Sequence, residues 1–456
     1  MAEKFDAIIV GAGQAGPPLA GRLTEAGHKV AVVERKLVGG TCVNYGCIPT
    51  KTLVASAHAA HLARRGAEYG VATGEITVDM GKVKARKDRI MLDDRHGLES
   101  WLDGMDGCTF LRGHARFEDP HTLRVDDRVL EADRIFLNVG GRAVVPDMPG
   151  LSEIDYMTNV DILDLDVIPE HLVVIGGSYI ALEFAQMYRR FGARVTVVEK
   201  GPRLTSREDE DVSAAIRDIL ENEGIAVELN ASAISFRKRE NGFEVIPRDG
   251  ADPIAGTHVL LAIGRRANTD DLGLENAGVE TDSRGNIVVD DQCRTNVEHI
   301  WAMGDCNGRG AFTHTSYNDF EIVAANLLDD DPRRISDRVP TYALYIDPPL
   351  GRAGLTVAEV RKSGRKALVG KRPMARVGRA VEKGETQGFM KVVVDAETEQ
   401  ILGAAILGVG GDEVVQDILD VMTAKLPYTA ISRTMHIHPT VSELVPTMLQ
   451  ELKPVD

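Results

Sequence analysis

Two stretches of the chain, residues 8–35 and 173–200, share one pattern of hydrophobic and polar positions and superimpose without a gap. Each begins with a short apolar strand and a glycine-rich turn, continues through an amphipathic helix to a glycine, and ends with a valine-rich strand and an acidic residue. Gly11 falls on Gly176, and Glu34 falls on Glu199. The pattern is typical of a βαβ unit, so the sequence predicts this unit twice.

Shorter apolar stretches lie between and after these units. Residues 108–117 and 259–263 are rich in β-forming residues and suit small antiparallel layers appended to parallel sheets. In the last third of the chain, residues 388–395 and 401–407 alternate as strands, and a helix is expected over residues 413–425. The sequence therefore predicts an α/β protein with two Rossmann-like dinucleotide-binding domains and a C-terminal α+β domain.

The composition narrows the classes of partner. The chain has 456 residues, with 53 Lys and Arg against 69 Asp and Glu, and its net charge of −16 disfavours nucleic acid and anionic membranes. No apolar run is long enough for a membrane helix, and the N-terminus lacks the pattern of a signal peptide, so a cytoplasmic protein is predicted. Five cysteines are too few for a disulfide framework.

The first glycine-rich turn is a complete GxGxxG, formed by Gly11, Gly13 and Gly16. The first glycine permits the tight turn, the second lets the backbone approach a pyrophosphate, and the third lets helix and strand pack closely. Glu34 ends the next strand, where its carboxylate can bind a ribose diol. A dinucleotide site is predicted here.

The second turn is less regular. Gly176 keeps the first position, but Ser178 and Ala181 stand at the second and third. Glu199 suits the free 2′-hydroxyl of NAD, whereas Lys200 and Arg203 could receive the 2′-phosphate of NADP. We expect a second dinucleotide site that favours NADH, with NADPH left open.

A cysteine pair follows the first unit. Cys42 and Cys47 are separated by four residues, which is not a usual zinc spacing, and no second Cys or His pair lies nearby to complete a zinc site. A redox disulfide is therefore the better interpretation, and no metal centre is predicted. Cys108, Cys293 and Cys306 have no partner at a useful spacing and are expected to be structural.

The segment GGTCVNYGCIPTKTL, residues 39–53, resembles the redox motif of the class I pyridine nucleotide-disulfide oxidoreductases, and the resemblance covers essentially the whole chain. The sequence AMGD ending at Asp305 is similar to the second FAD motif of that family. Residues 264–269 resemble the strand end that closes its nucleotide domain, and residues 113–115 resemble its backbone contact to the adenine side. The resemblance implies FAD as cofactor and NAD(P)H as co-substrate.

The resemblance also implies which residues bind these two molecules and how the chain divides. The implied FAD-binding residues are Gly11, Gly13, Gly16, Glu34, Arg35, Gly40, Thr41, Lys51, Ala115, Gly141, Asp305, Phe312 and Thr313. The implied NAD(P)-binding residues are Gly176, Ser178, Tyr179, Ile180, Glu199 and Gly264. The implied divisions are an FAD-binding domain of residues 1–147 and 269–337, an NAD(P)-binding domain of residues 148–268, and a dimerisation domain of residues 338–456.

By the same resemblance, Cys42 is the interchange thiol that faces the substrate, and Cys47 is the thiol stacked on the flavin. Lys51 is expected beside the flavin N5 atom, paired with Glu183 from the second repeat unit. A carboxylate partner would reduce the cost of placing the lysine in a partly buried site.

A candidate base lies near the C-terminus, in the HPTxxE sequence that runs from His438 to Glu443. A dithiol–disulfide exchange needs a group that accepts the thiol proton near pH 7, and a histidine oriented by a carboxylate suits this. The sequence matches the family segment that carries the catalytic His and Glu, whereas His436 has no such match. In that family the base serves the cysteines of the other subunit, so a homodimer with a shared active site is implied.

The acceptor stays open between three hypotheses. Residues 347–356 and the residues after Phe312 look closer to the mercuric-reductase-like and reactive-chlorine-resistance branch, which favours an NAD(P)H-dependent reductase of a disulfide or metal ion. Mercuric reductases, however, carry a C-terminal cysteine pair, and the last cysteine here is Cys306. The second hypothesis is a dihydrolipoamide dehydrogenase that acts on a lipoyl group, and the third is a non-enzymatic redox-sensing or scaffolding protein.

Overall fold

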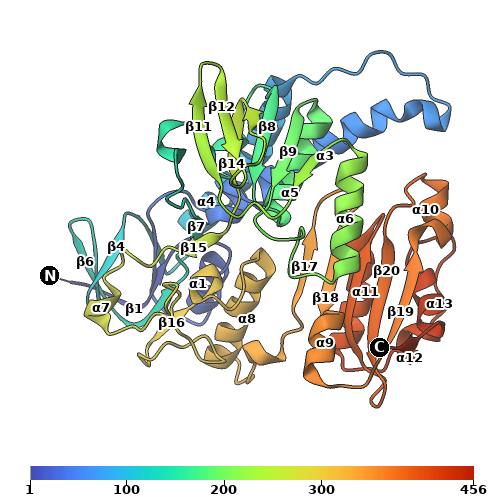
Figure 1. Cartoon of the computed structure of the whole chain (residues 1–456). Coiled ribbons are helices and arrows are strands. Elements are labelled where there is room, and N and C mark those ends of the chain that lie inside the picture. The colour runs from blue at the N-terminus through green and yellow to red at the C-terminus, as the bar shows by residue number, and fades with distance from the viewer. Residues whose placement is uncertain (1, 456) are drawn as a thin grey trace.

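The structure, a computed structural model, describes residues 2–455 and has three regions (Figure 1). The first lies at the lower left of the view and combines blue and yellow segments from distant parts of the sequence. The second, mostly green, lies above it, and the C-terminal region, orange to red, lies to the right. The predicted α/β class with two nucleotide-binding units and a C-terminal α+β region is confirmed.

Seven strands form the main sheet of the first region, in the order β3-β2-β1-β6-β5-β4 with β16 beside β6. Their bounds are β1 Glu3–Val10, β2 Val30–Glu34, β3 Cys108–Arg112, β4 Ala115–Asp119, β5 Thr122–Val125, β6 Arg128–Leu137 and β16 Ile300–Ala302. Helices α1 (Gly16–Glu25) and α8 (Thr313–Leu328) bury their apolar sides with one face of this sheet. The first glycine-rich turn therefore opens at the carboxyl end of a central strand, where nucleotides bind in such sheets.

The second region repeats this design on a smaller scale. Its parallel sheet has the order β10-β9-β8-β14, covered by α5 and α6, and an antiparallel sheet of β11, β12 and β13 is appended to it. The bounds are β8 His171–Ile175, α5 Tyr179–Phe191, β9 Arg194–Val198, α6 Glu210–Asn222, β10 Ala226–Glu228, β11 Ser235–Arg239, β12 Gly242–Ile246, β13 Ile254–Gly256 and β14 His258–Leu261. A two-stranded link of β7 (Gly141–Ala143) and β15 (Arg265–Ala267) joins the two regions.

Two expectations about strand direction were wrong. Both β3 and β14 pair in parallel with their neighbours, β2 and β8, instead of forming antiparallel layers. An apolar run shows that a segment is a strand, but the direction of pairing depends on a partner that lies far away in the sequence. Strand β4 is antiparallel, as expected.

The cysteine segment lies on α2 (Gly40–Tyr45) and the start of α3 (Cys47–Arg64), and α4 (Met80–Asp103) packs beside α3. Helix α3 packs on α5 through a shared core that includes Leu53 and Ala57 from α3 and Phe184 and Tyr188 from α5. This contact fixes the start of α3, and therefore Cys47, relative to the second region.

The C-terminal region is a six-stranded antiparallel sheet with helices on its faces. The strands are β17 Thr341–Leu344, β18 Leu350–Gly354, β19 Ala367–Pro373, β20 Phe389–Asp395, β21 Ile401–Leu407 and β22 Lys453–Pro454. The remaining helices are α7 Leu274–Ala277 in the first region and α9 Val357–Ser363, α10 Gly378–Glu382, α11 Gly411–Thr423, α12 Thr429–Ser432 and α13 Leu444–Gln450 in this one. Both predicted strands and the predicted helix are present. None of the helices in residues 2–455 has the length and apolar character that crossing a membrane requires.

Candidate active site

One cavity of about 2610 Å³ runs between the three regions. It is several times larger than the roughly 300–1,000 Å³ of an ordinary small-molecule site, so it has room for two dinucleotides. All the predicted cofactor-binding residues except Gly16 line it, as do Cys42, Cys47, Lys51 and Glu183. The cavity therefore brings together residues from both repeat units and from the later part of the chain.

The first glycine-rich turn is closed to side chains. A Cβ atom on Gly11 would lie 2.3 Å from the Asn138 carbonyl oxygen, and one on Gly16 would lie 2.2 Å from the Gly11 carbonyl oxygen. Gly16 thus packs behind the turn rather than on the cavity wall. The Glu34 carboxylate accepts hydrogen bonds from the backbone N–H groups of Ala12 at 2.9 Å and Lys36 at 2.7 Å. The turn presents backbone to the cavity, as a pyrophosphate requires.

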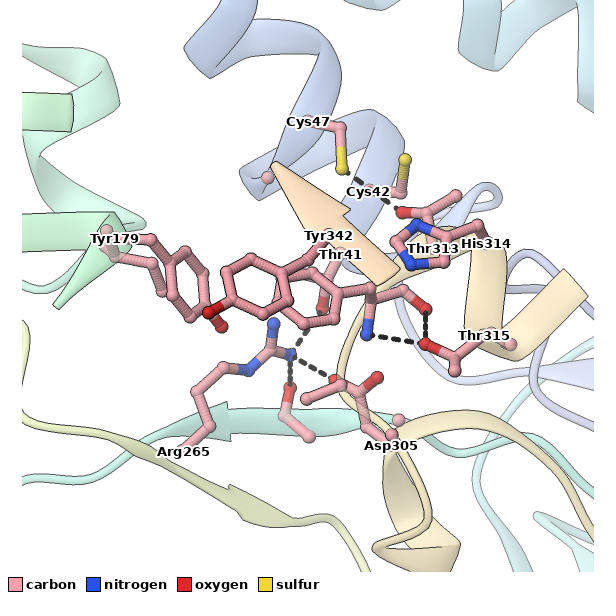
Figure 2. A pocket seen from close by; sticks show the side chains of 18 of the residues that line it. Thr41, Cys42, Cys47, Tyr179, Arg265, Asp305, Thr313, His314, Thr315 and Tyr342 are labelled. Atoms are coloured by element: carbon pink, nitrogen blue, oxygen red, sulfur yellow. Dashed lines mark hydrogen bonds and ion pairs between the residues drawn. The ribbon is translucent and has the colours of Figure 1, made fainter. Parts of the chain in front are cut away.

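The two cysteines lie side by side as thiols where α2 meets α3 (Figure 2). The hydrogen bond from Cys42 lowers the pKa of Cys47 to about 6 despite partial burial, with further help from Thr313 and Lys51. The same hydrogen bond and burial raise the pKa of Cys42. The geometry therefore favours a thiolate at Cys47 and a thiol at Cys42.

Lys51 and Glu183 form an ion pair with 2.7 Å between Nζ and Oε2. The other carboxylate oxygen of Glu183 accepts the backbone N–H of Tyr345 at 3.0 Å, and Lys51 Nζ lies 4.5 Å above the Tyr345 ring. Glu183 is only 3% exposed, and it is paired on both oxygens. The pair thus joins α3, α5 and the C-terminal region at one point of the cavity.

Asp305 lies at the opposite side of the cavity from the cysteines, beside Arg265 (Figure 2). The guanidinium Nη2 of Arg265 is 3.1 Å from the Asp305 carboxylate, and it donates to the Gly141 carbonyl at 2.7 Å. Burial raises the pKa of Asp305, and Arg265 opposes the rise. Sequence reasoning missed the role of Arg265, although Gly264 beside it was selected.

The second glycine-rich turn is more open. Gly176 is blocked like Gly11, because a Cβ atom would lie 2.4 Å from the Ala262 carbonyl oxygen. Ser178 is exposed and has extended backbone, with φ −110° and ψ −177°. Glu199 accepts the Gly201 backbone N–H at 2.7 Å, while Arg203 donates to the Ser206 carbonyl at 3.0 Å. In this conformation Arg203 is turned to its own loop.

Three aromatic rings line the cavity together: Phe312 and Tyr179, which were selected from the sequence, and Tyr342, which was not. The Phe312 ring stacks on Tyr342 at 5.5 Å with 2° between the planes, and it contacts Tyr179 at 5.4 Å. The Tyr342 hydroxyl bonds the carboxylate of Glu208, which is only 3% exposed. No repeat or motif marks Tyr342 or Glu208, and they meet only because β17 folds against the loop before α6.

Comparison with known proteins agrees with this geometry. Residues 5–319 match the family "Pyridine nucleotide-disulphide oxidoreductase", and residues 340–449 match its dimerisation domain. The chain belongs to this family. It is 35% identical to the probable pyridine nucleotide-disulfide oxidoreductase RclA of Escherichia coli, over 96% of this chain and 97% of that protein.

Other relatives differ in their named activities. A mercuric reductase of Streptomyces lividans and a dihydrolipoyl dehydrogenase of Haloferax volcanii are each 32% identical, over 96% of this chain and 94% of theirs. The solved Cu(II) complex of the HOCl-induced flavoprotein disulfide reductase RclA from Escherichia coli superimposes with a TM-score of 0.90 at 34% identity, covering 98% of this chain and 99% of that chain.

As a member of the family, the protein is an enzyme that uses FAD with NAD(P)H and has a homodimerisation domain. Its residues fit FAD, because Gly11 and Gly13 of the first turn present backbone to the cavity and Asp305 lines the same space. When bound there, FAD would carry electrons between the coenzyme and the cysteine pair.

His438 and Glu443, the predicted base and its carboxylate, are paired with each other but lie apart from the cysteines. His438 Nδ1 lies 3.0 Å from a Glu443 carboxylate oxygen, and the His438 side chain is 82% exposed. In a single chain, as described over residues 2–455, neither His438 nor Glu443 lines the cavity. The flanking Met435 and Ile437 are 95% and 80% exposed.

The three other cysteines are poor nucleophiles. Burial raises the pKa of Cys108 to about 11 and that of Cys306 to about 12, and it also raises the pKa of Cys293. Their thiols would therefore stay protonated at neutral pH. His436 also stands apart from the cysteines, with Nδ1 against the Thr434 carbonyl at 3.0 Å.

Proposed function

We propose that this protein is an FAD-dependent reductase that passes electrons from NAD(P)H through the Cys42–Cys47 disulfide to a disulfide or metal-ion acceptor. The observation that carries the proposal is the position of Cys42 and Cys47 side by side in the cavity that both glycine-rich turns line. Their surroundings differ, because the pKa of Cys47 is lowered and that of Cys42 is raised. Since the attacking species in disulfide exchange is a thiolate, Cys42 must give its proton to a base before it attacks, while Cys47 holds the charge beside the cofactor.

The roles of individual residues follow from this asymmetry. Cys47 is proposed as the flavin-side sulfur and Cys42 as the interchange sulfur. Lys51 supplies positive charge near Cys47, and Glu183 positions the lysine through the 2.7 Å ion pair.

We also propose the division into FAD-binding residues 1–147 and 269–337, NAD(P)-binding residues 148–268 and dimerisation residues 338–456.

The acid–base group is proposed to come from a second copy of the chain. His438 and Glu443 are already paired, yet they lie outside the cavity of their own chain. In the homodimer, His438 of the partner subunit would accept the proton from a thiol at Cys42 and return it. This arrangement explains why an exposed histidine is held by a carboxylate that is only 16% exposed.

Two named relatives support the choice of acceptor. The Escherichia coli neighbour is a flavoprotein disulfide reductase whose structure was solved as a Cu(II) complex. The Streptomyces relative is a mercuric reductase. A metal ion would act here as substrate.

The second candidate is dihydrolipoamide oxidation with NAD, which the His438–Glu443 pair and the Haloferax relative favour. The cytoplasmic location stays a prediction from the sequence.

Steady-state rates of the wild-type protein with dihydrolipoamide, small disulfides and Cu(II) or Hg(II) separate the two candidates. The role of the base is tested by rapid-reaction measurement of both half-reactions in His438→Gln, with His436→Gln as the control. Loss of the base is expected to slow exchange with dithiols or disulfides on the order of 10²–10⁴-fold. Reduction by NAD(P)H should hardly change, and turnover with Cu(II) or Hg(II) should fall less. Wild-type rates with a good disulfide substrate would remove His438 from the mechanism.

A further inference from the structure

The hydroxyl of Thr313 contacts the reacting sulfur. Thr313 Oγ1 lies 3.1 Å from Cys47 Sγ, and Figure 2 shows the residue beside both cysteines. The contact joins residues 266 positions apart in the sequence. Thr313 was selected from the sequence only as an FAD-binding residue, and that role does not require a hydroxyl against sulfur.

The hydroxyl is held in place by the start of α8. Thr313 is the first residue of this 16-residue helix, whose N-terminal end carries a partial positive charge. The preceding Phe312 is fixed because its backbone N–H donates to Thr315 Oγ1 at 3.1 Å and its carbonyl accepts the Thr315 hydroxyl at 2.8 Å. Its ring is stacked between His314 and Tyr342. Thr313 therefore has little freedom to turn from Cys47.

Lys51 alone does not account for a thiolate at Cys47. Its charge is paired with Glu183 at 2.7 Å, and Glu183 acts on the pKa of Cys47 in the opposite direction to Lys51. After the hydrogen bond from Cys42, Thr313 contributes more to lowering that pKa than Lys51 does. A neutral hydroxyl brings no opposing charge. It also lowers the pKa of Cys42, but its 3.1 Å contact is with the Cys47 sulfur.

We propose that Thr313 is a thiolate-stabilising residue whose hydroxyl donates a hydrogen bond to Cys47 and keeps the negative charge of the reduced pair on that sulfur. Cys42 then stays protonated until the base removes its proton. This inference rests on the proposed function, because it takes Cys42 and Cys47 to be the redox pair. It adds a hydroxyl whose 3.1 Å contact is with the Cys47 sulfur.

The test uses Cys42→Ser as the parent, because this variant cannot form the disulfide and leaves Cys47 facing the flavin. The pH dependence of its long-wavelength thiolate-to-flavin absorbance reports the pKa of Cys47. In this parent, Thr313→Val keeps the side-chain shape and removes the hydroxyl, and it should raise the pKa by about one to two units. Thr313→Ser should restore the parent value to within about half a unit.

Ser316→Ala is the matched control, because Ser316 lies in the same turn of α8 and its hydroxyl takes no part in the contacts that hold Phe312 or reach Cys47. Equal pKa values in the parent and Thr313→Val, or equal shifts in Thr313→Val and Ser316→Ala, would overturn the role of Thr313. Absence of the absorbance band from the FAD-loaded parent would instead contradict the proposed place of Cys47. If Thr313→Val binds no FAD, the pH dependence of iodoacetamide alkylation of Cys47 in FAD-free parent and variant gives the same comparison.

Discussion

The two glycine-rich units have the same order of elements but differ in how tightly they close. In the first, both Gly11 and Gly16 are blocked by carbonyl oxygens within 2.3 Å of a Cβ atom. In the second, Gly176 is blocked in the same way, but Ala181 is accommodated in the core and Ser178 is exposed. Both turns therefore require the first glycine, whereas the third glycine is required only in the first unit, where helix and turn pack more closely.

The acidic residues follow the same trend. Glu34 accepts two backbone N–H groups, whereas Glu199 accepts that of Gly201. Both carboxylate oxygens of Glu34 are thus hydrogen-bonded to backbone, and a unit held in this way suits a cofactor that stays bound. The second is freer to adjust, which suits a coenzyme that enters and leaves in each turnover.

The largest effect is expected when a methyl group is added to a glycine in the turn of the first unit. Gly16→Ala places a methyl group 2.2 Å from the Gly11 carbonyl, so the turn must shift. Such overpacking costs about 1–3 kcal/mol of unfolding free energy, and we expect FAD to be largely lost. Flavin absorbance per chain and urea unfolding measure both effects. Ala181→Gly is the control in the second unit and should cost only about 1 kcal/mol with FAD retained.

The next effect concerns the carboxylate of the first unit. Glu34→Gln keeps the shape but removes the charge that accepts the Ala12 and Lys36 N–H groups. A hydrogen bond to a charged group contributes about 1.5–3 kcal/mol, so FAD affinity measured by fluorescence titration should fall by at least about tenfold. Wild-type affinity would indicate that the turn is held without Glu34.

Coenzyme choice tests the carboxylate of the second unit. NADH should be preferred, because Glu199 repels a 2′-phosphate and Arg203 is engaged by Ser206 and by Glu210 at 3.5 Å. Glu199→Ala should move the ratio of kcat/KM for NADH and NADPH about tenfold toward NADPH, equal to about 1.4 kcal/mol. A wild-type preference for NADPH of tenfold or more would show that Lys200 and Arg203 decide instead.

The repeat pattern predicted both units because their contacts are local. Gly11 lies against Gly16 at the start of its helix, and each acidic residue bonds backbone groups within its own unit or directly after it. The spacing of Cys42 and Cys47 is also a local feature that a single sequence displays. The family resemblance added the Lys51–Glu183 pair, which spans 132 positions and has no local signal.

The remaining features depend on contacts between distant segments. Arg265 bonds Gly141 across 124 positions, and Tyr342 reaches Glu208 across 134. Neither pair has a spacing or a period that a single sequence displays. The parallel direction of β3 and β14 was missed for the same reason, since the partner strand decides it.

The smallest expected effect is at Ser178, the residue that most visibly breaks the second glycine pattern. Its backbone angles are open to any residue and its side chain is exposed, so glycine is not required there. Ser178→Gly should therefore change the KM for NADH by no more than about threefold, as for other substitutions on a surface. The reverse change in the first unit, Gly13→Ser, should weaken FAD binding, because a Cβ atom would lie 3.2 Å from Asn138 Nδ2. Steady-state kinetics and flavin content compare the two. A tenfold lower KM for NADH in Ser178→Gly would mean that the serine side chain obstructs the coenzyme. The second turn would then require glycine at this position, as the first turn does.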